Sequence, residues 1–203
     1  MKITTEDKVA NNKLYTEYEL LRMEDGWNAG DKDNNYRKLI KIKDLTGFPL
    51  FNAAVLDVGC GTGDLSAFLR TKNIGSYTGV DIYKPALSKA KIKYPKETFL
   101  EKDILSKSLQ DQKFDFTFCS GALSTNLPSD NYSFAEAMLQ EMWKMTGKGL
   151  AFNILSDDDK EPDPDLFFYN LKKIIKICKQ VAPESKIHIE KNSLSFQTHI
   201  YMF

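Results

Sequence analysis

The sequence predicts an α/β protein built on a doubly wound, mostly parallel, seven-stranded sheet that ends in an antiparallel strand. Two observations support this prediction. From residue 51 onward, short apolar runs alternate with amphipathic helical stretches, the pattern of strands joined by crossover helices. At the carboxyl end, two strand-like runs are separated by only three residues, a gap that permits only an antiparallel hairpin.

The first fifty residues are polar and follow a helical pattern. We expect residues 1–50 to form a helical extension, or lid, packed on one domain of residues 51–203. A second predicted helix carries residues 39–45. It should end at Gly47, because glycine suits the position just past a helix and Pro49 cannot continue one.

Five apolar runs are interpreted as parallel strands, because each is rich in β-favouring residues and too short for a free-standing helix. These runs are residues 53–58, 77–81, 98–100, 114–119 and 150–155. The helices expected between them are residues 63–72, 85–93 and 131–145.

The carboxyl-terminal quarter begins with a predicted helix that packs on one side. Its apolar stripe consists of Phe167, Leu171, Ile174, Cys178 and Val181. We expect Asp163 to cap this helix and Pro164 to occupy its first position. The two hairpin strands follow at residues 186–191 and 195–203.

Composition excludes several classes of protein. The 28 basic and 28 acidic residues give no net charge, which argues against a nucleic-acid partner. No apolar stretch approaches the ~20 residues of a membrane-spanning helix. The amino terminus lacks the apolar core of a secretory signal, so we expect a cytoplasmic protein. Three cysteines without a CxxC pair give no support for a metal site.

The most informative segment is residues 55–64, Val-Leu-Asp-Val-Gly-Cys-Gly-Thr-Gly-Asp. Three alternating glycines between a strand and a helix let the backbone turn sharply and let a ligand approach closely. A P-loop would need Gly-Lys followed by Ser or Thr, and a dinucleotide motif would need glycine where Asp64 stands. Because this carboxylate would repel a pyrophosphate, we expect a nucleoside without phosphates.

Acidic residues end the next two strands. Asp81 is expected to accept hydrogen bonds from both ribose hydroxyls. Asp103 would accept a hydrogen bond from the adenine amino group, while Ile82 and Ile104 sandwich the ring. The alternatives are that Asp81 merely precedes a turn and that Asp103 is a solvated loop residue.

Together, these features resemble a class I S-adenosylmethionine-dependent methyltransferase over residues 53–203. The likeness is closest in residues 55–64, and residues 114–121 resemble the fourth strand of that family. The resemblance implies the strand order 3-2-1-4-5-7-6, and S-adenosylmethionine as cofactor with S-adenosylhomocysteine as product. It places in the cofactor site Asp57, Gly59, Cys60, Gly61, Asp81, Ile82, Asp103, Ile104, Ser120 and Gly121.

Within that set, the resemblance assigns particular roles. Gly59 and Gly61 would line the methionine part, and Asp57 would support its amino group. Ser120 and Gly121 would form the floor near the sulfonium.

Two amino-terminal residues are further candidates for cofactor binding. Arg37 would pair with the methionine carboxylate, or else lie on the surface. Trp27 would cover the cofactor, or else pack in the ordinary way. The acidic run at residues 157–163 follows the fifth strand and would attract a cation, although we favour a solvated loop.

No residue is a convincing general base. Asn126, Asp130 and Tyr132 are the nearest candidates, whereas His188 and His199 fall inside predicted strands and are expected to be packing or surface residues.

The predicted function is therefore methyl transfer to an oxygen or nitrogen atom of a small-molecule acceptor by in-line displacement. A nicotinamide-dependent oxidoreductase and a non-catalytic binding protein remain alternatives.

Overall fold

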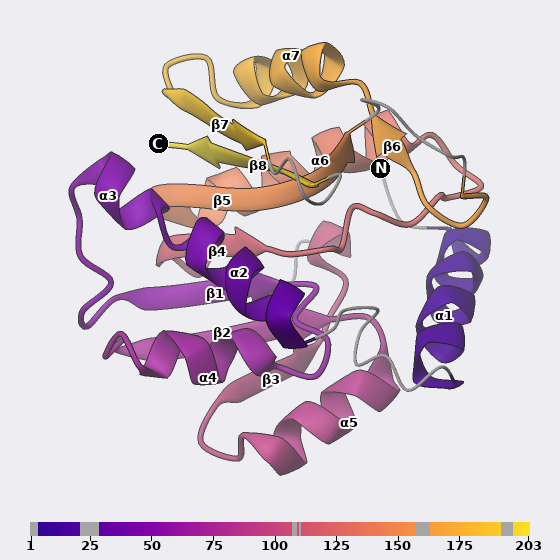
Figure 1. The fold of residues 1–203 in the computed structure, drawn as a ribbon, viewed down its shortest axis with the longest axis horizontal. Coiled ribbons are helices and arrows are strands. Elements are labelled where there is room, and N and C mark those ends of the chain that lie inside the picture. Colours follow the sequence, from indigo (N-terminus) through magenta and orange to yellow (C-terminus); the bar gives the residue numbers. More distant parts are fainter. Residues whose placement is uncertain (1–3, 21–28, 107–108, 110, 157–162, 192–196) are drawn as a thin grey trace.

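A computed structural model describes residues 4–20, 29–106, 109, 111–156, 163–191 and 197–203. Its centre is one sheet in the order β3-β2-β1-β4-β5-β8-β7, with the short strand β6 paired to β5 (Figure 1). The strands are β1 (Ala54–Val58), β2 (Ser76–Asp81), β3 (Thr98–Glu101), β4 (Phe114–Cys119), β5 (Thr146–Ser156), β6 (Phe168–Tyr169), β7 (Ile187–Lys191) and β8 (Gln197–Met202).

This order confirms the predicted sheet. The first five strands are parallel, and β8 lies antiparallel between β5 and β7. The numbering shifts by one only because the two residues of β6 form a strand that the sequence did not predict.

Helices cover both faces of the sheet. Figure 1 shows α2 and α4 in front of it and α6 behind. The helices are α1 (Thr5–Leu20), α2 (Ala29–Leu39), α3 (Ile42–Thr46), α4 (Asp64–Arg70), α5 (Lys84–Lys93), α6 (Asn131–Met145) and α7 (Leu171–Val181), with a 3₁₀ turn η2 at Ile104–Ser106. The buried apolar residues form two clusters, one under α2 to α5 and the other under α6, α7 and η2. The sheet is therefore doubly wound, as predicted.

The start of the last helix was predicted wrongly. Helix α7 begins at Leu171, and the Asn170 side chain caps it by accepting a hydrogen bond from the Lys173 N–H at 3.3 Å. Asp163 accepts instead from the Asp165 N–H at 2.9 Å, and Pro164 precedes β6 rather than opening a helix. Pairing of β6 with β5 outweighs the local capping signal.

The amino-terminal region is helical, as expected, but its second helix divides into α2 and α3. Helix α3 ends at Gly47, whose φ of 75° is the left-handed conformation expected past a helix. Helix α1 lies beside the loops that follow β4 and β5 (Figure 1). There the Ser129 N–H donates to Asp7 at 3.1 Å and the Thr125 hydroxyl donates to Asn11 at 2.6 Å.

Candidate functional site

The glycine loop turns the chain sharply between β1 and α4. Gly59, Gly61 and Gly63 all have positive φ, at 73°, 51° and 79°. A Cβ on Gly59 would lie 2.4 Å from the Ala122 Cβ, so the loop after β4 approaches this backbone too closely for a side chain. The motif therefore folds as the sequence predicted, and it brings the ends of β1 and β4 together.

A cavity of about 330 Å³ opens at these strand ends. All ten residues that the resemblance places in the site line it: Asp57, Gly59, Cys60, Gly61, Asp81, Ile82, Asp103, Ile104, Ser120 and Gly121. This is the edge of a doubly wound sheet at which ligands bind.

Asp81 is fixed by backbone hydrogen bonds. Its two oxygens accept from the N–H groups of Gly61 and Tyr83, each at 2.8 Å. A carboxylate can accept more than two hydrogen bonds, and this one is held rigidly at the wall of the cavity. The position suits the predicted recognition of ribose hydroxyls. Asp103 is held similarly, since its side chain accepts from the Leu105 N–H at 2.9 Å.

Asp57 lies below the glycine loop and is buried. It accepts a hydrogen bond of 2.6 Å from the Tyr77 hydroxyl on β2. Burial and, next, the nearby Asp57 carboxylate raise the pKa of Tyr77 well above its ordinary value, so the phenol stays protonated and keeps donating. The predicted support for a ligand amino group is compatible with this arrangement, because Asp57 also lines the cavity.

Asp64 is not an isolated negative charge. It pairs with Lys32 at 2.8 Å and Lys93 at 2.7 Å, and the Tyr94 hydroxyl donates to it at 2.8 Å. Burial alone would raise the pKa of Asp64, but these hydrogen bonds and charges lower it to about 2. Two lysines therefore offset most of the repulsion that Asp64 would exert on a pyrophosphate, so this carboxylate excludes such a ligand far less strongly than the sequence suggested.

Arg37 does not line the cavity. It lies on the outer side of α2, where its side chain is 65% exposed and pairs with Asp33. Lys32, about one and a half turns earlier, lines the cavity instead, with its side chain only 10% exposed. Trp27 and residues 157–162 of the acidic run lie outside the described residues.

Sequence reasoning missed the cavity residues contributed by the amino-terminal helices, which are Asn11, Leu14, Lys32, Asn35 and Tyr36. In α2, positions 32, 35 and 36 share one helical face with the buried Leu39. That spacing could have indicated which face of α2 points inward, although most of the side chains on this face are polar.

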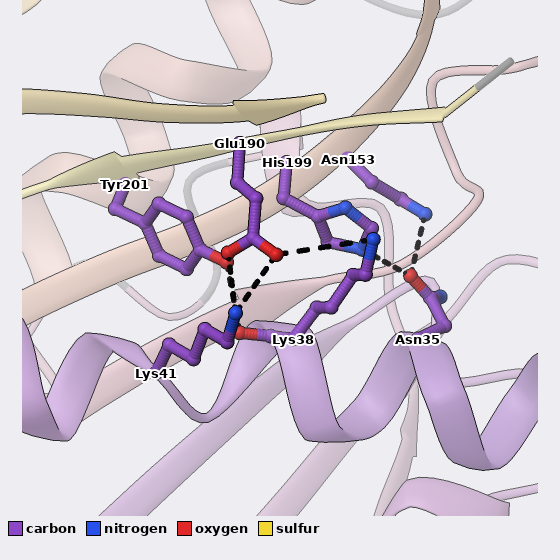
Figure 2. A network of polar contacts seen from close by, with 7 residues as sticks. All are labelled: Asn35, Lys38, Lys41, Asn153, Glu190, His199 and Tyr201. Atoms are coloured by element: carbon purple, nitrogen blue, oxygen red, sulfur yellow. Dashed lines mark hydrogen bonds and ion pairs between the residues drawn. The ribbon is translucent and has the colours of Figure 1, made fainter. Parts of the chain in front are cut away.

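Polar contacts attach this part of the chain to the carboxyl-terminal hairpin (Figure 2). Glu190 on β7 accepts from Lys41 at 2.8 Å, and Lys38 lies 3.9 Å away. Asn35 contacts the buried His199 on β8 and accepts a hydrogen bond of 3.2 Å from Asn153 on β5.

None of the three candidate bases lines the cavity. Asp130 caps α6, and the Tyr132 hydroxyl accepts from the Asn170 N–H at 3.0 Å. Asn126 donates to the Pro164 carbonyl at 2.9 Å. His188 is exposed and His199 is buried, as the strand assignments implied.

Comparisons with known proteins report similarity to methyltransferases. Residues 55–149 match a family model described as a methyltransferase domain. A malonyl-[acyl-carrier protein] O-methyltransferase from Hamiltonella defensa subsp. Acyrthosiphon pisum (strain 5AT) is 27% identical over 179 residues, which cover 78% of this chain and 66% of that protein, just under two thirds of its length. The family model spans slightly less than half of the chain, and together with this relative it supports the class I S-adenosylmethionine-dependent methyltransferase family that the sequence resembles.

Solved structures show the same fold. The magnesium protoporphyrin IX methyltransferase of Synechocystis PCC 6803 with bound S-adenosylhomocysteine has a TM-score of 0.70 at 16% identity, covering 97% of this chain and 99% of that one. A methyltransferase from Clostridium acetobutylicum ATCC 824 has a TM-score of 0.67 at 17% identity, covering 95% and 98%.

Two solved structures of that Synechocystis enzyme contain S-adenosylhomocysteine or S-adenosylmethionine, the pair that the sequence resemblance implies for this chain. The residues present fit S-adenosylmethionine, because the glycine loop admits close approach and a fixed carboxylate, Asp81, ends β2. Among the described residues, no group of three potential ligands could hold a metal ion, and no helix is long and apolar enough to cross a membrane.

Proposed function

We propose that this methyltransferase methylates an oxygen or nitrogen atom of a small molecule that binds in the same cavity. The observation that supports this is the extent of the cavity beyond the ten cofactor residues. It continues past β4 between α1, α6 and the ends of β5 and β8. The residues that line this part include Thr125, Phe134, Met138, Leu155, Leu166 and Gln197.

These residues suggest the character of the acceptor. Four of the six side chains are apolar, and the two others are a neutral hydroxyl and a neutral amide. An apolar wall with a few polar groups orients a small ligand and excludes water. S-adenosylmethionine supplies a methyl group on a sulfonium that is already activated. The task left to the chain is to align the acceptor atom, since positioning alone removes several kcal/mol of barrier.

We infer that Lys32, rather than Arg37, neutralises the carboxylate of the cofactor. Lys32 lines the cavity, and its ammonium places a positive charge there beside Asp64. We also propose that residues 1–50 act as a cover for the site, because Asn11 and Leu14 of α1 contribute to its wall.

The relatives support a small oxygen or nitrogen acceptor in general terms. The curated relative is named for O-methylation of a malonyl group on a carrier protein, and a structural neighbour from Bradyrhizobium japonicum WM9 is named an N-methyltransferase. Both atoms therefore stay in the proposal.

The test is transfer of an isotope-labelled methyl group from S-adenosylmethionine into a pool of metabolites. A Leu166→Trp variant should fill the acceptor part of the cavity, abolishing transfer while S-adenosylhomocysteine still binds with its wild-type Kd. An Ile92→Trp variant is the control, because Ile92 is exposed and does not line the cavity. Unchanged transfer by Leu166→Trp would contradict the proposed acceptor site.

A further inference from the structure

A row of buried side-chain amides lies behind the end of β4. The Gly121 N–H donates to Asn153 Oδ1 at 2.8 Å, and Asn153 Nδ2 donates to Asn35 Oδ1 at 3.2 Å. Asn35 Nδ2 in turn donates to Ser120 Oγ at 2.6 Å. The row therefore connects Gly121 to Ser120, the two neighbouring residues that are predicted to lie near the sulfonium of the cofactor.

The direction of every hydrogen bond in this row is determined. A backbone N–H can only donate, so Gly121 requires the oxygen of Asn153 to face it. The Asn153 nitrogen must then face Asn35, and it also donates to Gln197 Oε1 at 3.1 Å. Asn35 must present its oxygen to Asn153 and its nitrogen to Ser120.

His199 agrees with this direction. Its Nε2 contacts the same Asn35 oxygen, so Nε2 carries a proton. Burial and then the charges of Lys38 and Lys41 lower the pKa of His199 to about 4, despite the opposing effect of Glu190. Two donors thus converge on Asn35 Oδ1, which fixes the amide in one orientation.

Ser120 is left as a hydrogen-bond donor. Its oxygen already accepts from Asn35, so its own hydrogen points to another acceptor. No described residue accepts a hydrogen bond from this hydroxyl, and Ser120 lines the cavity. The row of amides therefore occupies one acceptor position of Ser120 and leaves its hydroxyl hydrogen available to a ligand in the cavity.

We propose that Asn35 and Asn153 are positioning residues that make Ser120 donate to the carboxylate at the amino-acid end of the cofactor. Asp81 and Asp103 locate the adenosine end near β2 and β3, so the amino-acid end extends toward β4 and α2. Lys32, on the same face of α2 as Asn35, adds a positive charge there. The inference depends on the cofactor and not on the acceptor.

The test compares two nucleosides by calorimetry. S-adenosylhomocysteine carries the carboxylate, whereas 5′-methylthioadenosine lacks the whole amino-acid end. Ser120→Ala should weaken S-adenosylhomocysteine by about tenfold, because a hydrogen bond to a charged group is lost, and should change 5′-methylthioadenosine by less than twofold. Equal effects on both nucleosides, or no effect on either, would overturn the proposal.

A second variant tests the polarity itself. Asn35→Asp is nearly isosteric but presents an oxygen to Ser120. The Ser120 hydroxyl should then donate to residue 35 and no longer to the ligand. A double variant combines Asn35→Asp with Ser120→Ala. We expect it to bind S-adenosylhomocysteine no more weakly than Asn35→Asp alone. Additive losses would mean that the new carboxylate at position 35 acts only by charge repulsion, which would overturn the role of Asn35.

Thermal unfolding shows whether each variant is folded. Ser120 is half-buried and Ser120→Ala removes one oxygen, so the comparison of the two nucleosides decides the donor role even if Asn35→Asp fails to fold. His199→Gln is the matched control within the network, because an amide N–H replaces the Nε2 donor. Its affinity for S-adenosylhomocysteine should stay within about twofold of wild type. A tenfold loss would contradict the direction that we assign to the network.

Discussion

The two walls of the cavity are built differently. The wall at the ends of β1 to β4 comes from one continuous part of the chain, and strand pairing and backbone hydrogen bonds fix its side chains. The wall from α1 and α2 is attached by side-chain contacts between residues far apart in the sequence, such as Thr125 with Asn11 and Asn153 with Asn35. The first wall is therefore set by local sequence, and the second by the tertiary fold.

The second wall is also mostly polar where it meets the domain. Among the described side chains of α1, only Asp7 and Leu14 are buried, so little apolar surface stabilises its position. We therefore expect substitutions in the first wall to affect folding and cofactor binding strongly, and substitutions in the second to produce smaller and more specific effects.

The largest effect is expected at Gly59. Gly59→Ala places a Cβ against Ala122 and also forces alanine to adopt a φ of 73°, so the free energy of unfolding should fall by about 3 kcal/mol. Gly47→Ala is the matched control, because its φ is 75° but no atom lies within 4 Å of the new Cβ. It should lose about 1 kcal/mol. Urea unfolding of both variants measures the difference, and equal losses would show that close approach of the loops is unimportant.

Asp81→Ala should produce the next largest effect. The variant loses the hydrogen bond from Gly61 that orders the glycine loop, the one from Tyr83 that orders the turn after β2, and the expected ribose contact. S-adenosylhomocysteine should therefore bind about 100-fold more weakly. Calorimetry measures this Kd. Asp44→Ala removes an exposed carboxylate outside the cavity and should not change it. Equal affinity of Asp81→Ala and wild type would refute the cofactor role of Asp81.

The contrast between the walls also explains what the sequence could predict. The turn from β1 to α4 has a local signature, because backbone bending there requires glycine and the next strands end in acids. For this reason, all ten residues that the resemblance places in the cofactor site line the cavity. Strand order followed from the same resemblance, whereas β6 was missed because a two-residue strand has no periodicity of its own.

The amino-terminal wall could not be predicted in the same way. Helix α2 has no apolar stripe to show which side faces the sheet, since its inward positions include Lys32 and Asn35. From residue chemistry alone, Arg37 was a better candidate than Lys32 for binding the cofactor carboxylate, because a guanidinium can pair with a carboxylate through two hydrogen bonds. Which of Lys32 and Arg37 faces inward depends on how α2 packs, and that is a property of the whole fold.

The attachment of α2 should also depend on pH. The pKa of His199 is lowered from 6.5 to about 4 by burial and by Lys38 and Lys41, so the unfolded chain binds more protons between these values. Stability should therefore fall as pH falls from about 7 to about 5, by about 2 kcal/mol from this group. His199→Gln, which keeps a donor to Asn35, should lose that part of the dependence. Urea unfolding at the two pH values measures it, and identical slopes for both proteins would contradict the assignment.

The smallest effect separates Lys32 from Arg37, two of the cations of α2. Lys32→Met removes the positive charge that we place beside the cofactor carboxylate, so S-adenosylhomocysteine should bind about tenfold more weakly. Arg37→Met should change the Kd by less than twofold, because Arg37 is exposed and pairs with Asp33. Since Asp64 keeps Lys93 as a partner in the Lys32→Met variant, the start of α4 stays neutralised. The reverse ranking of the two variants would mean that α2 presents its other face to the cofactor, and that the second wall of the cavity is arranged differently from the one described.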